Sequence, residues 1–167
     1  MMLAFDTWYT DEQAKTACIC FHDWQDPKPA QVLTEVRAPG AAYEPGAFYK
    51  RELPCILSLL TQFSLPEVSA IVVDGFVVLD DAGKPGLGQH LYDHLSGKIP
   101  VIGVAKNKYA DLDQAQRKLY RGQSQKPLYI TAAGIDLDLA THYISLMKGP
   151  FRIPDLLKHL DQLSRQP

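Results

Sequence analysis

Three acidic residues stand at or near runs of apolar residues that have the composition of buried strands. Asp74 directly follows a run of four apolar residues, Asp6 lies in the apolar start of the chain, and Glu52 lies on a segment that leads into the strand ending at Asp74. Because ligands in open α/β sheets gather beyond the carboxyl ends of parallel strands, we expect these carboxylates to converge there. They would repel one another unless a cation shared the site, and their oxygens suit Mg²⁺ or Mn²⁺. Such a site can activate water and stabilise the leaving oxygen of a phosphodiester.

Each of these carboxylates also has a purely structural explanation. Asp74 and Gly75 form a dipeptide that is common in turns, so Asp74 is compatible with an ordinary strand end. Asp6 is compatible with hydrogen bonds to nearby backbone, and Glu52 with a solvated position on a helix. The three residues together favour a metal site more than any one of them does alone.

The elements around these residues have the pattern of a mixed α/β sheet. Three early strands are separated by short polar links, which is typical of an antiparallel meander. Two later runs, AIVVD and PVIGV, are almost entirely apolar, as in strands that helices bury on both faces. The pattern predicts a mixed five-stranded central sheet flanked by helices, in the order of the ribonuclease H-like fold. The predicted strands cover residues 2–7, 16–24, 30–37, 70–74 and 101–104, with a later one at 128–131, and the predicted helices cover residues 47–63, 87–95, 137–147 and 155–163.

Length and composition are those of an ordinary globular protein. The 167 residues suffice for one domain with a sizeable core, which we expect to span residues 1–167. The 17 basic and 19 acidic residues argue against wholesale coating of nucleic acid, although a local basic groove stays possible. No stretch approaches the roughly 18 apolar residues of a membrane span. The three cysteines have no zinc spacing and are interpreted as reduced residues of a cytoplasmic protein.

Four further segments carry a family resemblance. They are YEPGAFYKRELP at residues 43–54, VVDGF at 72–76, GLGQHL at 86–91 and IPVIGVAK at 99–106. In this order and at this spacing they closely resemble the endonuclease V family, and KPLYIT and FRIP continue the likeness toward the C-terminus. The resemblance implies a ribonuclease H-like fold and a Mg²⁺-dependent enzyme that nicks nucleic acid near deaminated bases, chiefly inosine.

The resemblance also assigns roles to four residues by position. Asp6 and Asp74 would be metal ligands, and Glu52 would bind the metal or its attacking water. Lys106, at the end of a buried strand, would face the scissile phosphate, as a compact cation can. A solvated lysine at a strand end is the alternative for Lys106, and the surrounding IGVAK sequence favours the functional role.

The segment YEPG would be a wedge loop, placed into the helix stack where the lesion base is extruded. Tyrosine offers a stacking face, proline fixes φ, and glycine permits close approach of the backbone, as base flipping requires. The alternative is a rigid Pro-Gly turn with the tyrosine packed into the core. The residues implied to contact nucleic acid or to lie at the pocket of the flipped base are Tyr43, Pro45, Gly46, Phe48, Gly75 and Gly103.

Three motifs depart from the family pattern. The family usually has DGHG after the metal aspartate, where this chain has DGFV, and its serine-proline-glycine-histidine-arginine stretch is TAAGID here. The C-terminal proline-threonine-arginine run before a histidine is reduced to PDLLKH. His159 in this segment either takes the position of the family's histidine or is a simple helix-surface residue.

The leading functional hypothesis is therefore a monomeric, Mg²⁺-dependent or Mn²⁺-dependent endonuclease acting on DNA or RNA that contains deaminated bases. The first alternative is a catalytically altered nucleic-acid-binding protein that kept the fold and the wedge. The second is a metal-dependent phosphoesterase on another, smaller substrate, because the lost glycine and basic residues would reshape the groove. The joint presence of Asp6, Glu52, Asp74 and Lys106 speaks against the binder, which has no need of three crowded carboxylates.

Overall fold

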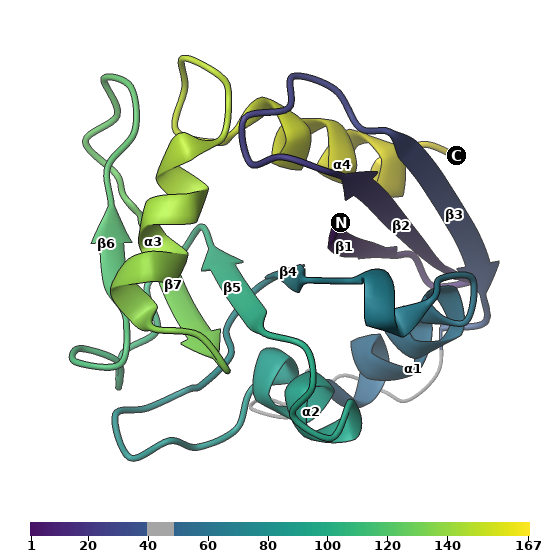
Figure 1. The fold of residues 1–167 in the computed structure, drawn as a ribbon. Coiled ribbons are helices and arrows are strands. Elements are labelled where there is room, and N and C mark those ends of the chain that lie inside the picture. The colour runs from purple at the N-terminus through teal and green to yellow at the C-terminus, as the bar shows by residue number, and fades with distance from the viewer. Residues whose placement is uncertain (40–48) are drawn as a thin grey trace.

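A mixed sheet runs through the part of the protein that the structure, a computed structural model, describes, namely residues 1–39 and 49–167. Within these residues the sheet has seven strands in the order β3-β2-β1-β4-β5-β7-β6 (Figure 1). The strands are β1 Met2–Tyr9, β2 Ala14–Phe21, β3 Gln31–Arg37, β4 Ala70–Asp74, β5 Val101–Ala105, β6 Arg117–Leu119 and β7 Leu128–Ala133.

The first five strands confirm the predicted ribonuclease H-like order. Strands β1, β2 and β3 form an antiparallel meander, and β1 pairs in parallel with β4, which pairs in parallel with β5. The predicted number of five strands is wrong, because β7 joins β5 in antiparallel pairing and β6 then pairs with β7. β6 is only three residues long and lies in a polar connection, so it carries no alternation by which the sequence could reveal it.

Two pairs of helices cover the two faces of the sheet (Figure 1). α1 and α2 pack against each other on one face, while α3 contacts β7 and β6, and α4 contacts β1 and β2, on the other. A short 3₁₀ turn at Leu65–Glu67 precedes β4. The helices are α1 Tyr49–Leu60, α2 Leu87–His94, α3 Leu137–Leu146 and α4 Asp155–Arg165.

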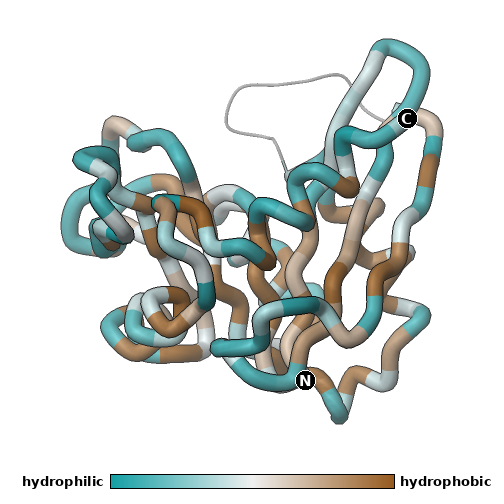
Figure 2. The backbone as a smooth tube through the Cα atoms, turned by 90° about the horizontal axis from the view of Figure 1, so that it is seen from above, coloured by the Kyte–Doolittle hydropathy of each residue, from teal (hydrophilic) through white to brown (hydrophobic). Residues whose placement is uncertain are grey.

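The alternation of side chains along the strands decides which residues meet each helix layer. On β1, Met2 and Ala4 belong to the core beneath α3 and α4, whereas Leu3 and Phe5 belong to the core beneath α1 and α2. The central strands are apolar on both faces for this reason, and Figure 2 shows hydrophobic segments running through the interior. The even-numbered residues of β1, β4 and β5 therefore point toward the face that α4 covers, and the site begins where those series reach the strand ends.

Two expectations from composition can be compared with the described structure. All three cysteines are buried and unpaired, which confirms the expectation of free thiols. Within residues 1–39 and 49–167, no helix combines the length and the apolar character needed to cross a membrane.

Candidate active site

Asp6 and Asp74 lie side by side at the point where the parallel pairing of β1 with β4 ends. Phe5 pairs with Val73 in the ladder between β1 and β4, so the two aspartates are the next residues along these strands. Asp6 is 7% exposed, while the side chain of Asp74 at the strand end is 41% exposed. Burial raises the pKa of Asp74, and a side-chain hydrogen bond with Asp6 is among the influences that oppose the rise, so the two carboxyl groups are in contact. The structure thus brings Asp6 and Asp74 together, as the sequence predicts for these two residues.

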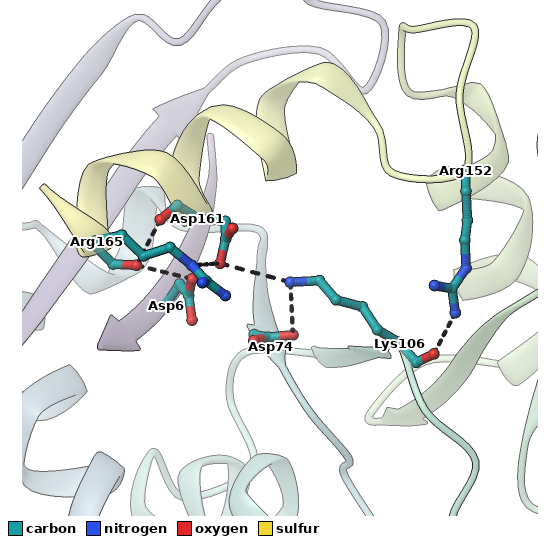
Figure 3. A network of polar contacts seen from close by, with 7 residues as sticks. Asp6, Asp74, Lys106, Arg152, Asp161 and Arg165 are labelled. Atoms are coloured by element: carbon teal, nitrogen blue, oxygen red, sulfur yellow. Dashed lines mark hydrogen bonds and ion pairs between the residues drawn. The ribbon is translucent and has the colours of Figure 1, made fainter. Parts of the chain in front are cut away.

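The last turn of α4 covers Asp6 from above the sheet (Figure 3). The Ser164 hydroxyl donates a hydrogen bond to Oδ2 of Asp6 at 3.1 Å. A cavity of about 20 Å³, enough for one water molecule, lies between α4 and the strands and reaches Asp6, Asp74 and Lys106. The helix thus closes one side of the site while leaving a small space beside the carboxylates.

Lys106 directly follows β5 and extends across the strand ends toward the aspartates (Figure 3). Its Nζ lies 4.0 Å from Oδ1 of Asp74 and 3.8 Å from Oδ1 of Asp161 on α4. The same Asp161 oxygen accepts a hydrogen bond from Nε of Arg165 at 3.0 Å. Two acidic and two basic side chains therefore form one ionic network beside Asp6.

Arg152 fixes the backbone from which Lys106 projects. Its guanidinium donates hydrogen bonds to the carbonyl oxygens of Lys106 and Pro127, the latter at 2.7 Å from Nη2. The residues immediately after β5 are held against the start of β7 in this way. These contacts fix the backbone position from which the Lys106 side chain reaches the aspartates.

Glu52 approaches from the opposite helix layer. It lies in the first turn of α1, whose Ile56 and Leu59 pack into the core beneath α1 and α2. The Glu52 side chain is buried, at 5% exposure, and burial raises its pKa well above the usual range. Charge repulsion from Asp74 and Asp6 raises the pKa further, so all three acidic groups interact.

The crowding is visible in the pKa values of the aspartates. Burial, and after it the charge of the Asp74 carboxylate, raise the pKa of Asp6 to about 7, although Lys106 and the Ser164 hydroxyl oppose the rise. Burial also raises the pKa of Asp74, while the Lys106 ammonium opposes that rise. The buried acidic groups retain protons at a pH where free carboxyls are ionised.

The donor chemistry of these residues fits a hard divalent cation. The three side chains offer carboxylate oxygens, the donors that Mg²⁺ and Mn²⁺ prefer, and their mutual repulsion is what a shared cation relieves. In the described ranges, no three acidic, histidine or cysteine side chains are already grouped around one point as ligands. The two aspartates face α4 whereas Glu52 comes from α1, so a bound ion would have to draw them together.

Comparison with known proteins identifies the family of the chain. The sequence model of the endonuclease V family matches residues 1–134. The chain belongs to the endonuclease V family. No curated protein matches the chain by sequence.

Solved structures of endonuclease V share this fold over almost the whole chain. The enzyme from Streptomyces avermitilis is 26% identical, with a TM-score of 0.78 and coverage of 98% of this chain and 79% of that one. Ciona intestinalis endonuclease V, in complex with DNA containing an inosine followed by a ribo-adenosine, is 19% identical (TM-score 0.79, coverage 98% and 84%). Human endonuclease V is 22% identical (TM-score 0.78, coverage 98% and 82%).

Three residues of the site were missed by sequence reasoning, and all lie on α4, beyond the stretch that the endonuclease V sequence model matches. Ser164 had a local signal, because Leu156, Leu160 and Ser164 are the buried positions of α4 at spacings of four. A small polar residue on such an apolar stripe indicates a polar partner beneath it. Asp161 and Arg165 had no comparable signal, since exposed charges on a helix are ordinary.

The remaining predicted residues are placed as follows. His159 lies on the exposed side of α4, beside Pro27 and Lys28, and the structure does not bring it to the carboxylates. Gly75 has a φ of +127°, which suits glycine, and open space surrounds the position that its side chain would take. Gly103 instead packs against the Gly75 carbonyl and the Thr131 hydroxyl. The other four predicted contacts with nucleic acid, at Tyr43, Pro45, Gly46 and Phe48, lie outside the described residues.

Proposed function

We propose that this protein is a Mg²⁺-dependent or Mn²⁺-dependent endonuclease that acts as a monomer and cleaves a phosphodiester bond near inosine in DNA or RNA. Membership of the endonuclease V family supports a nuclease that acts on deaminated bases. The DNA bound to the Ciona relative contains inosine, which supports this base as the lesion. The carboxylate cluster supports the dependence on a divalent cation.

The observation that carries the proposal is the burial of Asp6 against Asp74 with Glu52 and Lys106 beside them. A fold does not gain stability from three mutually repelling carboxyl groups of which two are buried. Binding of a cation together with an anionic substrate would explain why such a cluster is present. The adjacent ammonium group then matches the charge of a phosphate.

In the proposed mechanism Asp6 and Asp74 would hold the cation, and Glu52 would bind either the cation or its attacking water. Asp161 lies near enough to Lys106 to adjust the charge of the site. A bound cation would supply Lewis-acid activation of water and stabilisation of the leaving oxygen. The Nζ of Lys106 neutralises a non-bridging oxygen of the phosphate, as a compact cation can. If Glu52 binds the attacking water, its carboxylate would accept a proton from it, and its raised pKa makes it a stronger base than an ordinary carboxylate.

A second candidate is a nucleic-acid-binding protein without catalysis. The observation that favours it is the ion pairing of Lys106 with Asp74 and Asp161, which offsets acidic charge without a metal. This second candidate does not explain why Glu52 is buried near two other carboxylates. Burial and the charges of Asp74 and Asp6 raise the pKa of Glu52 more than any basic side chain lowers it.

The proposal is tested with end-labelled DNA and RNA strands that carry one inosine, beside otherwise identical strands that carry guanine. The wild-type protein should nick the inosine strands in Mg²⁺ or Mn²⁺ and leave them intact in EDTA. Asp74→Asn should reduce nicking more than about 100-fold, because it removes a charge that the cation needs. The matched control is Glu67→Gln, which removes one acidic charge at the opposite end of the sheet, where the Glu67 carbonyl binds the N-terminus.

Each outcome of this assay has a definite meaning. Absence of nicking of every strand in both metals rejects the nuclease, and oligonucleotide binding by that inactive protein supports the second candidate. Metal-dependent nicking without preference for inosine retains the catalytic site and rejects the specificity. Equal loss of activity in Asp74→Asn and Glu67→Gln rejects the assigned role of Asp74.

A further inference from the structure

Trp8 is a large aromatic side chain that stands exposed beside the carboxylates. It lies two residues beyond Asp6 on β1, so it is on the same face of the sheet, about 7 Å farther along the strand. The preceding residues of this series, Met2, Ala4 and Asp6, are covered by the layer of α3 and α4, whereas Trp8 is 41% exposed. The indole therefore marks the point at which the covered face of β1 opens to solvent.

The last turn of α4 holds the ring from one side. The Arg165 guanidinium carbon lies 4.1 Å from the centroid of the indole, and Nε of the same group binds Asp161. Lys15 is the residue opposite Trp8 on β2, and its Nζ donates a hydrogen bond to the carbonyl of Gln166 at 2.9 Å. Trp8 is thus flanked by two cationic side chains, each anchored by a second contact.

Trp24 shows what a structural tryptophan looks like in the same protein. Its ring stacks on Tyr143 at a centroid distance of 5.1 Å and lies edge-on to Phe21 at 5.5 Å, so this partly buried ring packs against the core. Trp8 has no aromatic neighbour within the described residues, and its described ring contact is the guanidinium of Arg165. Packing of the core does not account for a tryptophan at the position of Trp8.

We infer that the indole of Trp8 is a stacking platform for a nucleobase of the bound single strand, an inference that rests on the proposed function for the identity of that strand as substrate. An aromatic face flanked by basic side chains is the arrangement with which proteins hold single strands without reading their sequence. The offset of about 7 Å from Asp6 is short on the scale of a bound strand, so the indole stands near the carboxylates. The stacked base thus belongs to a nucleotide close to the phosphate at the carboxylates, separate from the lesion base.

Tryptophan fluorescence tests this contact directly, because the chain has only two tryptophans. In the Trp24→Phe variant, Trp8 is the sole indole emitter. A short oligothymidylate added in EDTA should quench its emission in a saturable way and protect it from acrylamide. In the matched Trp8→Phe variant, the emission of Trp24 should not respond to the same titration.

Affinity provides a second, independent measurement. Trp8→Leu keeps an apolar side chain but has no ring, and it should weaken binding of a labelled oligothymidylate about ten-fold or more. The slope of log affinity against log salt should stay unchanged, because the phosphate contacts remain. Circular dichroism and the Trp24 emission of Trp8→Leu show whether its fold is intact, and the fluorescence titration does not depend on that variant.

The results separate this inference from the proposed function. Unquenched Trp8 emission at saturating oligonucleotide, or undiminished affinity in folded Trp8→Leu, overturns the platform even if the protein nicks inosine strands. Quenching in a protein that nicks nothing supports the platform and rejects the nuclease. A wild-type protein that binds no oligothymidylate overturns the inference as well.

Discussion

Replacing Asp6 by asparagine should make the metal-free protein more stable at alkaline pH while abolishing cleavage. The asparagine has the shape of the aspartate, and its amide can accept the hydrogen bond from Ser164 and donate one to Asp74. It cannot ionise, so it removes the cost of a buried negative charge beside Asp74. Loss of cleavage follows because a neutral amide is a poor ligand for a hard divalent cation.

The size of the effect follows from the pKa of Asp6. Burial and the Asp74 charge move it from 3.8 to about 7, a difference of about three pKa units. Each unit corresponds to about 1.4 kcal/mol, so the ionised form of Asp6 costs the native state on the order of 4 kcal/mol. This is a large share of the roughly 5–15 kcal/mol by which a typical domain is stable.

The sign of the pH dependence is fixed by the direction of the shift. Because the native pKa is raised, the native state binds more protons than the unfolded chain between about pH 4 and pH 7. The contribution of Asp6 to stability is therefore favourable below that window and is lost as the pH rises through it. The gain from Asp6→Asn should be under about 1 kcal/mol near pH 4 and about 4 kcal/mol near pH 8.

Urea denaturation in EDTA at a series of pH values measures this difference. Glu67→Gln, an exposed position at the far end of the sheet, controls for the loss of one acidic charge. A stability gain for Asp6→Asn that does not grow between pH 4 and pH 8 would refute the reasoning, as would an equal gain in Glu67→Gln. Added Mg²⁺ should stabilise the wild type and leave Asp6→Asn nearly unchanged, because ligand binding to the native state alone raises its stability.

Three more outcomes are expected. Lys106→Met should abolish nicking and raise the pKa of Asp74, because the ammonium group now holds that pKa down; carboxyl NMR titration measures it. Arg121→Met should lower the free energy of unfolding, measured in urea, by about 3 kcal/mol. The Arg121 guanidinium donates hydrogen bonds to the carbonyl oxygens of Met147 and Phe151, and the substitution leaves both without this charged donor. Thiol titration should find three reactive groups after denaturation and almost none before it, since burial raises the pKa of Cys18 and shields all three thiols.

The residue pattern of the strands was sufficient to predict that Asp6 and Asp74 meet. The positions of Asp6 and Asp74 follow from the ends of two apolar runs and from the order in which such strands pair. Lys106 was assigned through the family resemblance, and the parallel pairing of β4 with β5 places it at the same edge of the sheet. Side-chain alternation then places all three on one face without any knowledge of the helices.

The site residues on α4 reach the carboxylates only because this helix packs against strands that are distant from it in the sequence. Ser164 bonds an aspartate that is 158 residues away, and Asp161 meets Lys106 only after the helix has packed across β1 and β2. The amphipathic pattern predicts that such a helix packs somewhere but does not fix the strands that it crosses. On α4, only Ser164, a polar residue within the apolar stripe, indicated a buried polar partner.

The energetics of Asp6 connect stability with function in one residue. The ionised form of Asp6 costs the metal-free fold on the order of 4 kcal/mol. Substitutions that relieve this cost would stabilise the metal-free fold, so retention of the aspartate is typical of a binding site, where function outweighs stability. In the proposed function, the same charge that destabilises the metal-free state would strengthen binding of a cation, because the cation would relieve the repulsion between Asp6, Asp74 and Glu52. The contacts of α4 keep Asp6 buried, through the Ser164 hydroxyl and through the Lys15 bond that anchors the end of the helix. A fold without this cap would let water solvate Asp6, which would lower its pKa toward the ordinary value and weaken the gain on binding the cation.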